Sequence, residues 1–145
     1  MTGKYILLLA SLTNFAIALL HIVIPFMGVN GYIYFGTSEL ALLESQGSFI
    51  PELATWFLAL GFAGFGFYCL SGAALIRRLP LLELTLWFMG GIYTLRGLAL
   101  ISDVQRFLKG QAFPMRQPFF SAIALTIGLM VLIGIWLRTR TLHPK

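Results

Sequence analysis

The sequence predicts an all-α integral membrane protein, an antiparallel four-helix bundle with short interfacial helices in its outer loops. Three observations support this fold class. First, 59% of the 145 residues are apolar and 10% are charged, with a mean hydropathy of +0.89, so water cannot be the main solvent. Second, the apolar residues form four runs of about 20 residues, enough to cross roughly 30 Å of hydrocarbon as a helix. Third, the basic residues gather at the ends of these runs.

The four runs are expected to be helices because every backbone amide in lipid must be hydrogen-bonded within its own segment. In chain order the predicted spans are Tyr5–Met27, Ala54–Ile76, Leu81–Ile101 and Pro118–Leu137. The chain has no internal repeat, no low-complexity stretch and no domain boundary, which favours a single transmembrane domain over residues 1–145.

The distribution of Lys and Arg predicts that both termini are cytoplasmic. If the spans alternate in direction, one side carries Lys4, Arg77, Arg78, Arg138, Arg140 and Lys145, and the other carries Arg106, Lys109 and Arg116. The more basic side is expected to face the cytoplasm. The segment 28–53 contains Glu39, Glu44 and Glu52 but no Lys or Arg, which is typical of an exported loop.

The connections differ in length on the two sides. The short segment Arg77–Pro80 predicts an antiparallel hairpin of the second and third spans, with Pro80 in the first turn of the third. In the first outer loop, Ser38–Glu44 reads as a short helix on the membrane surface with Ser38 as its N-cap. The second outer segment, Ser102–Gln117, mixes apolar and charged residues and is expected to do the same.

One face of the first span carries polar residues. Ser11, Asn14, Ala18 and His21 recur at steps of three and four, so they share a helix face. Asn14 and His21 would be unpaired polar groups in lipid, so we expect this face to turn toward protein or a water-filled cleft. A helix–helix contact and a functional cleft both remain open.

Small residues mark the contact faces of the later spans. They are Ala59, Gly61, Ala63, Gly64 and Gly66 on the second, Gly90, Gly91, Thr94 and Gly97 on the third, and Ser121, Ala124 and Gly128 on the fourth. Close helix packing, within one chain or in a homo-oligomer, is their simplest purpose.

The candidate site is a polar cluster at the outer leaflet. Its predicted ligand-binding residues are His21, Asn14, Tyr93, Arg96, Glu39, Glu44, Glu52 and Asp103. Arg96 is the proposed anchor for a phosphate or carboxylate, because its planar fork of donors suits such groups. The competing interpretation is an Arg that extends to the interface and pairs with a loop carboxylate. Glu83 is expected to pair with Arg77 or Arg78 at the other end of its span.

Several functional classes are disfavoured. The imidazoles are those of His21 and His143 and the single thiol is that of Cys69, so we expect no metal site and no cofactor. Nucleic-acid binding is also not expected, because membrane topology accounts for the basic residues.

Two motifs carry a family resemblance. The runs Tyr68–Leu82 and Tyr93–Leu98, together with His21 and the Tyr34–Gly36 turn, resemble a group of small four-span bacterial inner-membrane proteins without an assigned activity. The resemblance covers spans one to three and the first outer loop, whereas span four is similar only in being apolar. It implies four-helix topology and a bacterial source, and nothing about a substrate.

The leading functional expectation is a non-enzymatic protein whose outer-leaflet pocket binds a membrane lipid or small amphiphile, or which serves a partner membrane protein such as a transporter. The alternative is an intramembrane enzyme acting on a lipid-like or quinone-like substrate, with His21 as the catalytic acid or base and Arg96 as the electrostatic anchor.

Overall fold

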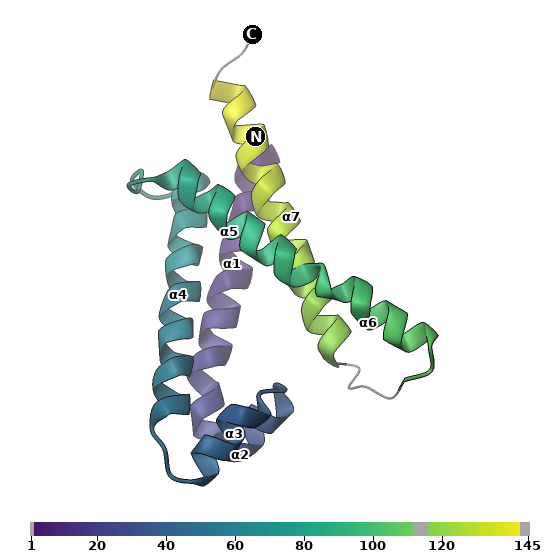
Figure 1. The fold of residues 1–145 in the computed structure, drawn as a ribbon. Helices are drawn as coiled ribbons and strands as arrows, with labels where there is room; N and C mark the ends of the chain where they lie inside the picture. Colours follow the sequence, from purple (N-terminus) through teal and green to yellow (C-terminus); the bar gives the residue numbers. More distant parts are fainter. Residues whose placement is uncertain (1, 112–115, 143–145) are drawn as a thin grey trace. The chain divides into compact units, whose positions relative to one another are not determined.

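The computed structural model describes residues 2–111 and 116–142, and within these ranges it contains helices and no strand. Figure 1 shows the elements in chain order. They are α1 (Thr2–Val23), the 3-10 helix η1 (Ile24–Met27), α2 (Gly28–Tyr34), α3 (Ser38–Ser45), α4 (Ile50–Gly72), α5 (Leu82–Gly97), α6 (Ala99–Leu108) and α7 (Arg116–Leu142). The all-helical prediction is confirmed. Of the residues used above, His143 and Lys145 lie outside the described ranges, as does 112–115 of the second outer segment.

Four helical stretches in the described part of the chain are long and apolar enough to cross a membrane: Thr2–Tyr34, Ile50–Gly72, Leu82–Leu108 and Arg116–Arg140. Large apolar side chains on them remain exposed, including Phe57 and Phe88, as expected of helices that meet lipid. Three C-terminal bounds differ clearly from the prediction. The first stretch continues through η1 and α2 to Tyr34 and does not end at Met27. The second stretch ends at Gly72 and not at Ile76, and the third runs on through α6 to Leu108.

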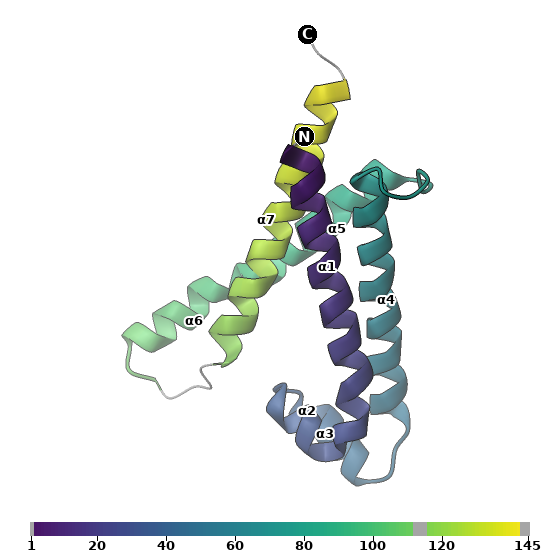
Figure 2. The ribbon, with the colours of Figure 1, turned by 180° about the vertical axis from the view of Figure 1, so that it is seen from behind.

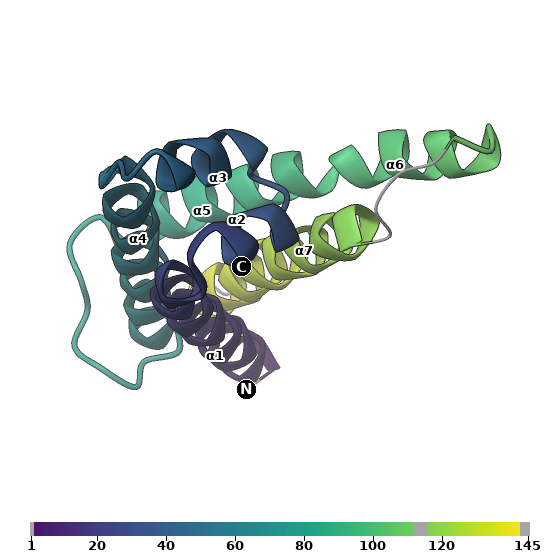
Figure 3. The same cartoon turned by 90° about the horizontal axis from the view of Figure 1, so that it is seen from below.

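The chain folds as two compact units, Leu12–Gly66 and Met1–Ser11 with Phe67–Lys145. In the first of these units α2 lies beside α3 (Figure 3). Tyr32 is buried between them with Ile24 and Ala41. Each helix is followed by a glycine of positive φ, Gly36 after α2 and Gly47 after α3. The left-handed turn lets the amide of the glycine and the amide of the next residue donate to carbonyls in the last turn of the helix.

The short helix predicted in the first outer loop is confirmed, but the capping assignment is wrong. Ser38 is the first helical residue, and Thr37 occupies the N-cap position without a side-chain cap. The Thr37 hydroxyl instead donates to the Tyr32 carbonyl at 3.1 Å, because the preceding turn brings that carbonyl within reach.

In the second unit, α5 and α7 pack as an antiparallel pair through their glycines. A Cβ at Gly97 would lie 2.5 Å from the Leu125 backbone, and one at Gly128 would lie 2.7 Å from the Thr94 nitrogen. The predicted packing role of these small residues is therefore confirmed for this pair. The start of α1 lies beside the last turns of α7 (Figure 2), where a Cβ at Gly3 would meet the Gly134 carbonyl at 3.0 Å.

The connection between α4 and α5 covers residues 73–81 and is longer than the sequence predicts. Pro80 lies outside the first turn of α5, because α5 begins at Leu82 and Leu81 before it has a left-handed backbone with φ +52°. The buried Ser71 hydroxyl fixes this connection by donating to the Arg77 carbonyl at 3.0 Å and accepting from the Leu79 amide at 2.9 Å.

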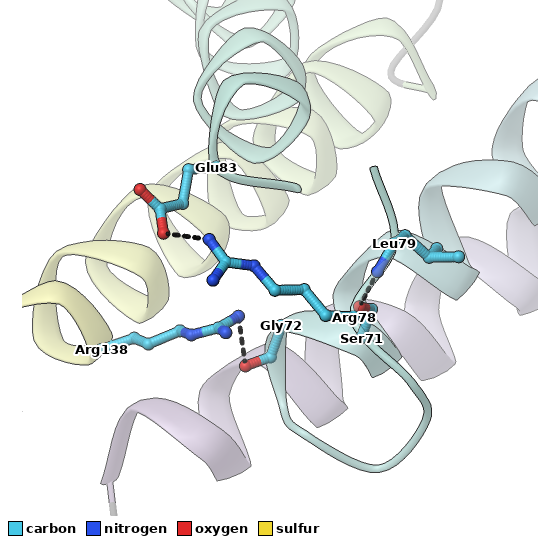
Figure 4. Close-up of polar contacts among 6 residues, drawn as sticks. All are labelled: Ser71, Gly72, Arg78, Leu79, Glu83 and Arg138. Carbon is cyan, nitrogen blue, oxygen red and sulfur yellow. Dashed lines mark hydrogen bonds and ion pairs between the residues drawn. The ribbon is translucent and has the colours of Figure 1, made fainter. Parts of the chain in front are cut away.

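Two arginines complete this end of the unit (Figure 4). Arg78 pairs with Glu83 at 3.1 Å, so the predicted pairing of Glu83 is confirmed for Arg78. Arg138 of α7 donates to the Gly72 carbonyl at 3.1 Å. A cation at that position satisfies one of the carbonyls that the last turn of α4 leaves without an intrahelical partner.

Candidate functional site

The candidate site lies where α5, α6 and α7 meet. Close contact between Gly97 and the Leu125 backbone marks the end of α5. Leu98 keeps a helical backbone, with φ −63° and ψ −18°, so α6 continues after a one-residue break. Arg96 is thereby placed in the last turn of α5, and Asp103 lies within α6 on the far side of the break.

A serine of α7 joins these two charged residues. The Arg96 Nη1 donates to the Ser121 Oγ at 3.1 Å, and the Ser121 hydroxyl donates to the Asp103 Oδ2 at 2.9 Å. Ser121 is 1% exposed and Asp103 is 6% exposed. Within the described ranges no direct ion pair joins Arg96 to Asp103. The hydroxyl therefore carries the interaction between the guanidinium and the buried carboxylate.

The arrangement leaves the guanidinium available to a ligand. Arg96 is an exposed residue, and a guanidinium has five N–H donors, of which one Nη1 donor is used on Ser121. Its remaining donors suit bidentate binding of a phosphate or carboxylate. Between Arg96 and Arg116 the sequence adds Arg106 and Lys109 as further basic residues, against Asp103 as the one acid. The local charge therefore favours an anionic partner.

Among the predicted site residues, the structure brings together Arg96 and Asp103. The sequence spacing of seven residues predicts that they share a face of a continued helix, and the two indeed reach the same serine. Tyr93 is buried one turn before Arg96 on α5. The sequence pattern predicts only a packing role for Ser121. Its position among small residues on the contact face was the available signal, since such a hydroxyl has to find a partner when buried.

The remaining predicted residues belong to the other unit. Asn14 is fully buried, and with Ser11 and Ala18 it forms a buried face of α1, as predicted for that stripe. The His21 Nδ1 donates to the Ile17 carbonyl at 2.8 Å, and its ring lies 4.7 Å from the Phe62 ring. These contacts match the helix–helix interpretation of His21, and they leave Nε2 as the proton-accepting nitrogen of the neutral ring.

The three loop carboxylates have different surroundings. Glu39 is exposed on α3, while Glu44 and Glu52 are half-buried. The Oε2 atom of Glu44 is buried without a hydrogen-bond partner. Near these acids the Thr55 hydroxyl donates to the Pro51 carbonyl at 2.7 Å, which anchors the first turn of α4.

The described residues hold no cluster of three or more His, Cys, Asp or Glu side chains that could bind a metal ion. A surface hollow lined by residues 78–84 lies at the opposite end of α5 from Arg96. The sequence did not predict this hollow, whose lining includes Leu81 with its left-handed backbone. No protein-family model, curated protein or solved structure matches the chain.

Proposed function

We propose that this chain is a membrane-embedded four-helix bundle that binds an amphiphile with an anionic headgroup at Arg96. The observation that carries the proposal is the Arg96–Ser121–Asp103 chain, in which a buried carboxylate and a serine orient an exposed guanidinium. An Arg within an apolar helix needs a partner or water, and Ser121 supplies only one hydrogen bond. The oxygens of an anionic headgroup would accept hydrogen bonds from the remaining guanidinium N–H donors of Arg96.

The proposed setting is the outer leaflet of a bacterial inner membrane, with both termini in the cytoplasm. The Lys and Arg distribution along the chain supports this orientation. Single cysteines at Arg77 and Glu44 in a Cys69→Ala background, exposed to a membrane-impermeant thiol reagent in intact cells, would test it. We expect labelling at position 44 and protection at position 77. The reverse pattern would invert the orientation.

A direct test of the site measures binding of dodecyl phosphate to the protein in an uncharged detergent by titration calorimetry. Arg96→Leu should weaken binding at least tenfold, about 1.4 kcal/mol. Arg96→Lys should weaken it less, because the charge remains while bidentate geometry is lost. Arg140→Leu is the matched control, since Arg140 is an exposed Arg that stacks on Trp136. Equal affinity of Arg96→Leu and wild type would refute the site.

The second candidate is an intramembrane enzyme acting on a lipid-like or quinone-like substrate. The observation in its favour is the Nδ1 hydrogen bond of His21, which leaves Nε2 able to accept a proton. An enzyme would lose turnover in both His21→Gln and Arg96→Leu. Binding of dodecyl phosphate that depends on Arg96 and is unchanged in His21→Gln would favour the non-enzymatic proposal.

A further inference from the structure

Helix α6 has two unlike faces. One face is formed by apolar residues that follow each other at steps of one and three: Leu100, Ile101, Val104, Phe107 and Leu108. Ser102, Gln105, Arg106 and Lys109 occupy the opposite side. On the apolar face Phe107 is 61% exposed and Leu108 is 77% exposed, so the described residues of the chain leave that face largely uncovered.

The contact with α7 lies between these two faces. At 100° per residue, Asp103 falls about a quarter-turn from the centre of the apolar face and about a quarter-turn from the polar one. Asp103 is the residue of α6 that bonds to Ser121 of α7. Helix α7 therefore covers one flank of α6 and neither of its two main faces. Toward its C-terminal end α6 diverges from α7 (Figures 1 and 2).

If the stretch that contains α5 and α6 crosses a bilayer, its length brings α6 to the edge of the hydrocarbon layer. The stretch Leu82–Leu108 has 27 residues. At about 1.5 Å per residue it extends roughly 40 Å, which exceeds the roughly 30 Å hydrocarbon core. Helix α5 is apolar except near its ends, whereas α6 carries Asp103 and Arg106. The part of the stretch that exceeds the thickness of the hydrocarbon core is therefore the charged C-terminal part, α6.

Arg96 lies on the same flank as Asp103, because seven residues are nearly two helical turns. Its guanidinium is therefore close to the line where the apolar and polar faces of α6 meet. For a helix that lies in the membrane surface, such a line is at the level of the lipid phosphates, above the acyl chains. The basic residues Arg106 and Lys109 lie on the polar side of the same helix.

We propose that α6 is an interfacial helix and that, with Arg96, it forms a site for an anionic phospholipid of the surrounding leaflet. The acyl chains of the lipid lie along the exposed apolar face, and its phosphate is bound by Arg96. Arg106 and Lys109, roughly 15 and 20 Å further along the helix, add positive charge to the same surface. This inference rests on the proposed function of Arg96 and names its ligand class, a membrane phospholipid and not a water-soluble anion. Such a ligand enters sideways from the bilayer.

The first experiment tests the placement of α6 without reference to any ligand. Nitroxides attached to single cysteines at Val104, Phe107, Ser102 and Gln105, in a Cys69→Ala background, are measured in nanodiscs of phosphatidylcholine and phosphatidylglycerol. Oxygen, which dissolves in the lipid, should accelerate the relaxation of nitroxides at positions 104 and 107, and a water-soluble nickel chelate should not. Nitroxides at positions 102 and 105 should respond to the nickel chelate and little to oxygen. Equal access of nickel to both pairs would overturn the proposal. Protection of 104 and 107 from both reagents would also overturn it, because a second copy or partner protein would then cover the face.

The second experiment tests the ligand. Native mass spectrometry of protein released from nanodiscs with equal amounts of the two lipids should retain phosphatidylglycerol at least fivefold over phosphatidylcholine. Arg96→Leu should remove this preference, and Phe107→Asn should reduce retention of both lipids. Arg140→Leu is the control that should behave as wild type.

The outcomes separate this inference from the proposed function. Dodecyl phosphate binding that depends on Arg96 and is displaced by millimolar glycerol phosphate would keep the site but overturn the phospholipid assignment. Phosphatidylglycerol retention unchanged in Arg96→Leu, with the expected nitroxide pattern, would remove Arg96 from the site and leave α6 as an interfacial helix. Absence of any preference for phosphatidylglycerol in wild-type protein would overturn the inference outright.

Discussion

The two ends of α5 use arginine in different ways. At its beginning, Arg78 pairs directly with Glu83, and Arg138 donates to the Gly72 carbonyl (Figure 4). At its end, Arg96 reaches Asp103 only through the Ser121 hydroxyl. The first two guanidiniums have an anion or a helix-end carbonyl as a direct partner, and the third does not.

This difference distinguishes two arginines that stabilise the fold from Arg96, for which we propose a binding role. The side chains of Arg78 and Glu83 are 69% and 45% accessible to solvent, so their pair contributes about 0–1 kcal/mol. Arg138 stabilises the end of a helix. Arg96 is held in one orientation by a neutral hydroxyl, which fixes the guanidinium without neutralising it. Such an arrangement keeps the charge available for an anionic ligand.

The largest expected stability effect concerns the glycine that positions Arg96. Gly97→Ala would place a Cβ about 2.5 Å from the nitrogen, Cα and Cβ atoms of Leu125, so a backbone shift is required. We expect a loss of about 3 kcal/mol, the upper end of the range for overpacking. Gly91→Ala on the same helix meets nothing within 4 Å and should be neutral or stabilise by up to about 1 kcal/mol. Reversible unfolding in a single detergent system would measure both, and similar losses would mean that α5 and α7 do not pack through Gly97.

The next effect concerns the serine between the two charges. Ser121→Ala leaves the buried Asp103 carboxylate without its hydroxyl partner, which should cost about 2 kcal/mol. It should also weaken dodecyl phosphate binding, because Arg96 loses its orienting contact. Ser102→Ala is the control, since the exposed Ser102 hydroxyl bonds only to the Ala99 carbonyl in its own turn. An Ser121→Ala variant as stable as Ser102→Ala would show that the hydroxyl is not needed to hold Asp103.

A smaller effect is expected at the opposite end. Arg138→Met removes the donor to the Gly72 carbonyl while keeping an apolar side chain of similar length. We expect a loss of about 1 kcal/mol, because Arg138 is partly exposed and water can replace part of the bond. Dodecyl phosphate binding should not change. If Arg138→Met weakened that binding as strongly as Arg96→Leu, the contrast between the two ends of α5 would disappear.

The sequence predicted the elements that apolar length and periodicity determine. Four long helices, the short helix after Thr37 and the buried face at Asn14 follow from residue spacing. The Arg78–Glu83 pair follows from charges near a helix start. These features depend on local order along the chain, which a single sequence contains.

The sequence could not predict features that depend on contacts between distant segments. The Ser121 bridge requires α7 to lie across the break after Gly97, and no local pattern specifies that crossing. The sequence predicts a later end of the second span, at Ile76, because the residues after Gly72, Ala73–Ile76, are apolar and continue the hydropathy pattern. The chain leaves the helix there at an alanine, a residue without the usual turn signal.

The smallest expected effect on stability concerns the alanine in this turn, which lies in the connection between α4 and α5. Ala74 has φ +56°, with its amide bonded to the Ser71 carbonyl and the Leu75 amide bonded to the Leu70 carbonyl, the pattern in which glycine is usual. A left-handed backbone costs a residue with a Cβ about 1–2 kcal/mol, and glycine loses about 0.5–1 kcal/mol of chain entropy. Ala74→Gly should therefore stabilise the protein by roughly 0.5 kcal/mol. Ala73→Gly, one residue earlier where φ is negative and the site is buried, should instead destabilise it by about 1 kcal/mol. A pair of unfolding curves in one detergent decides the matter, because equal destabilisation by both substitutions would mean that α4 continues past Gly72 as the hydropathy pattern indicates.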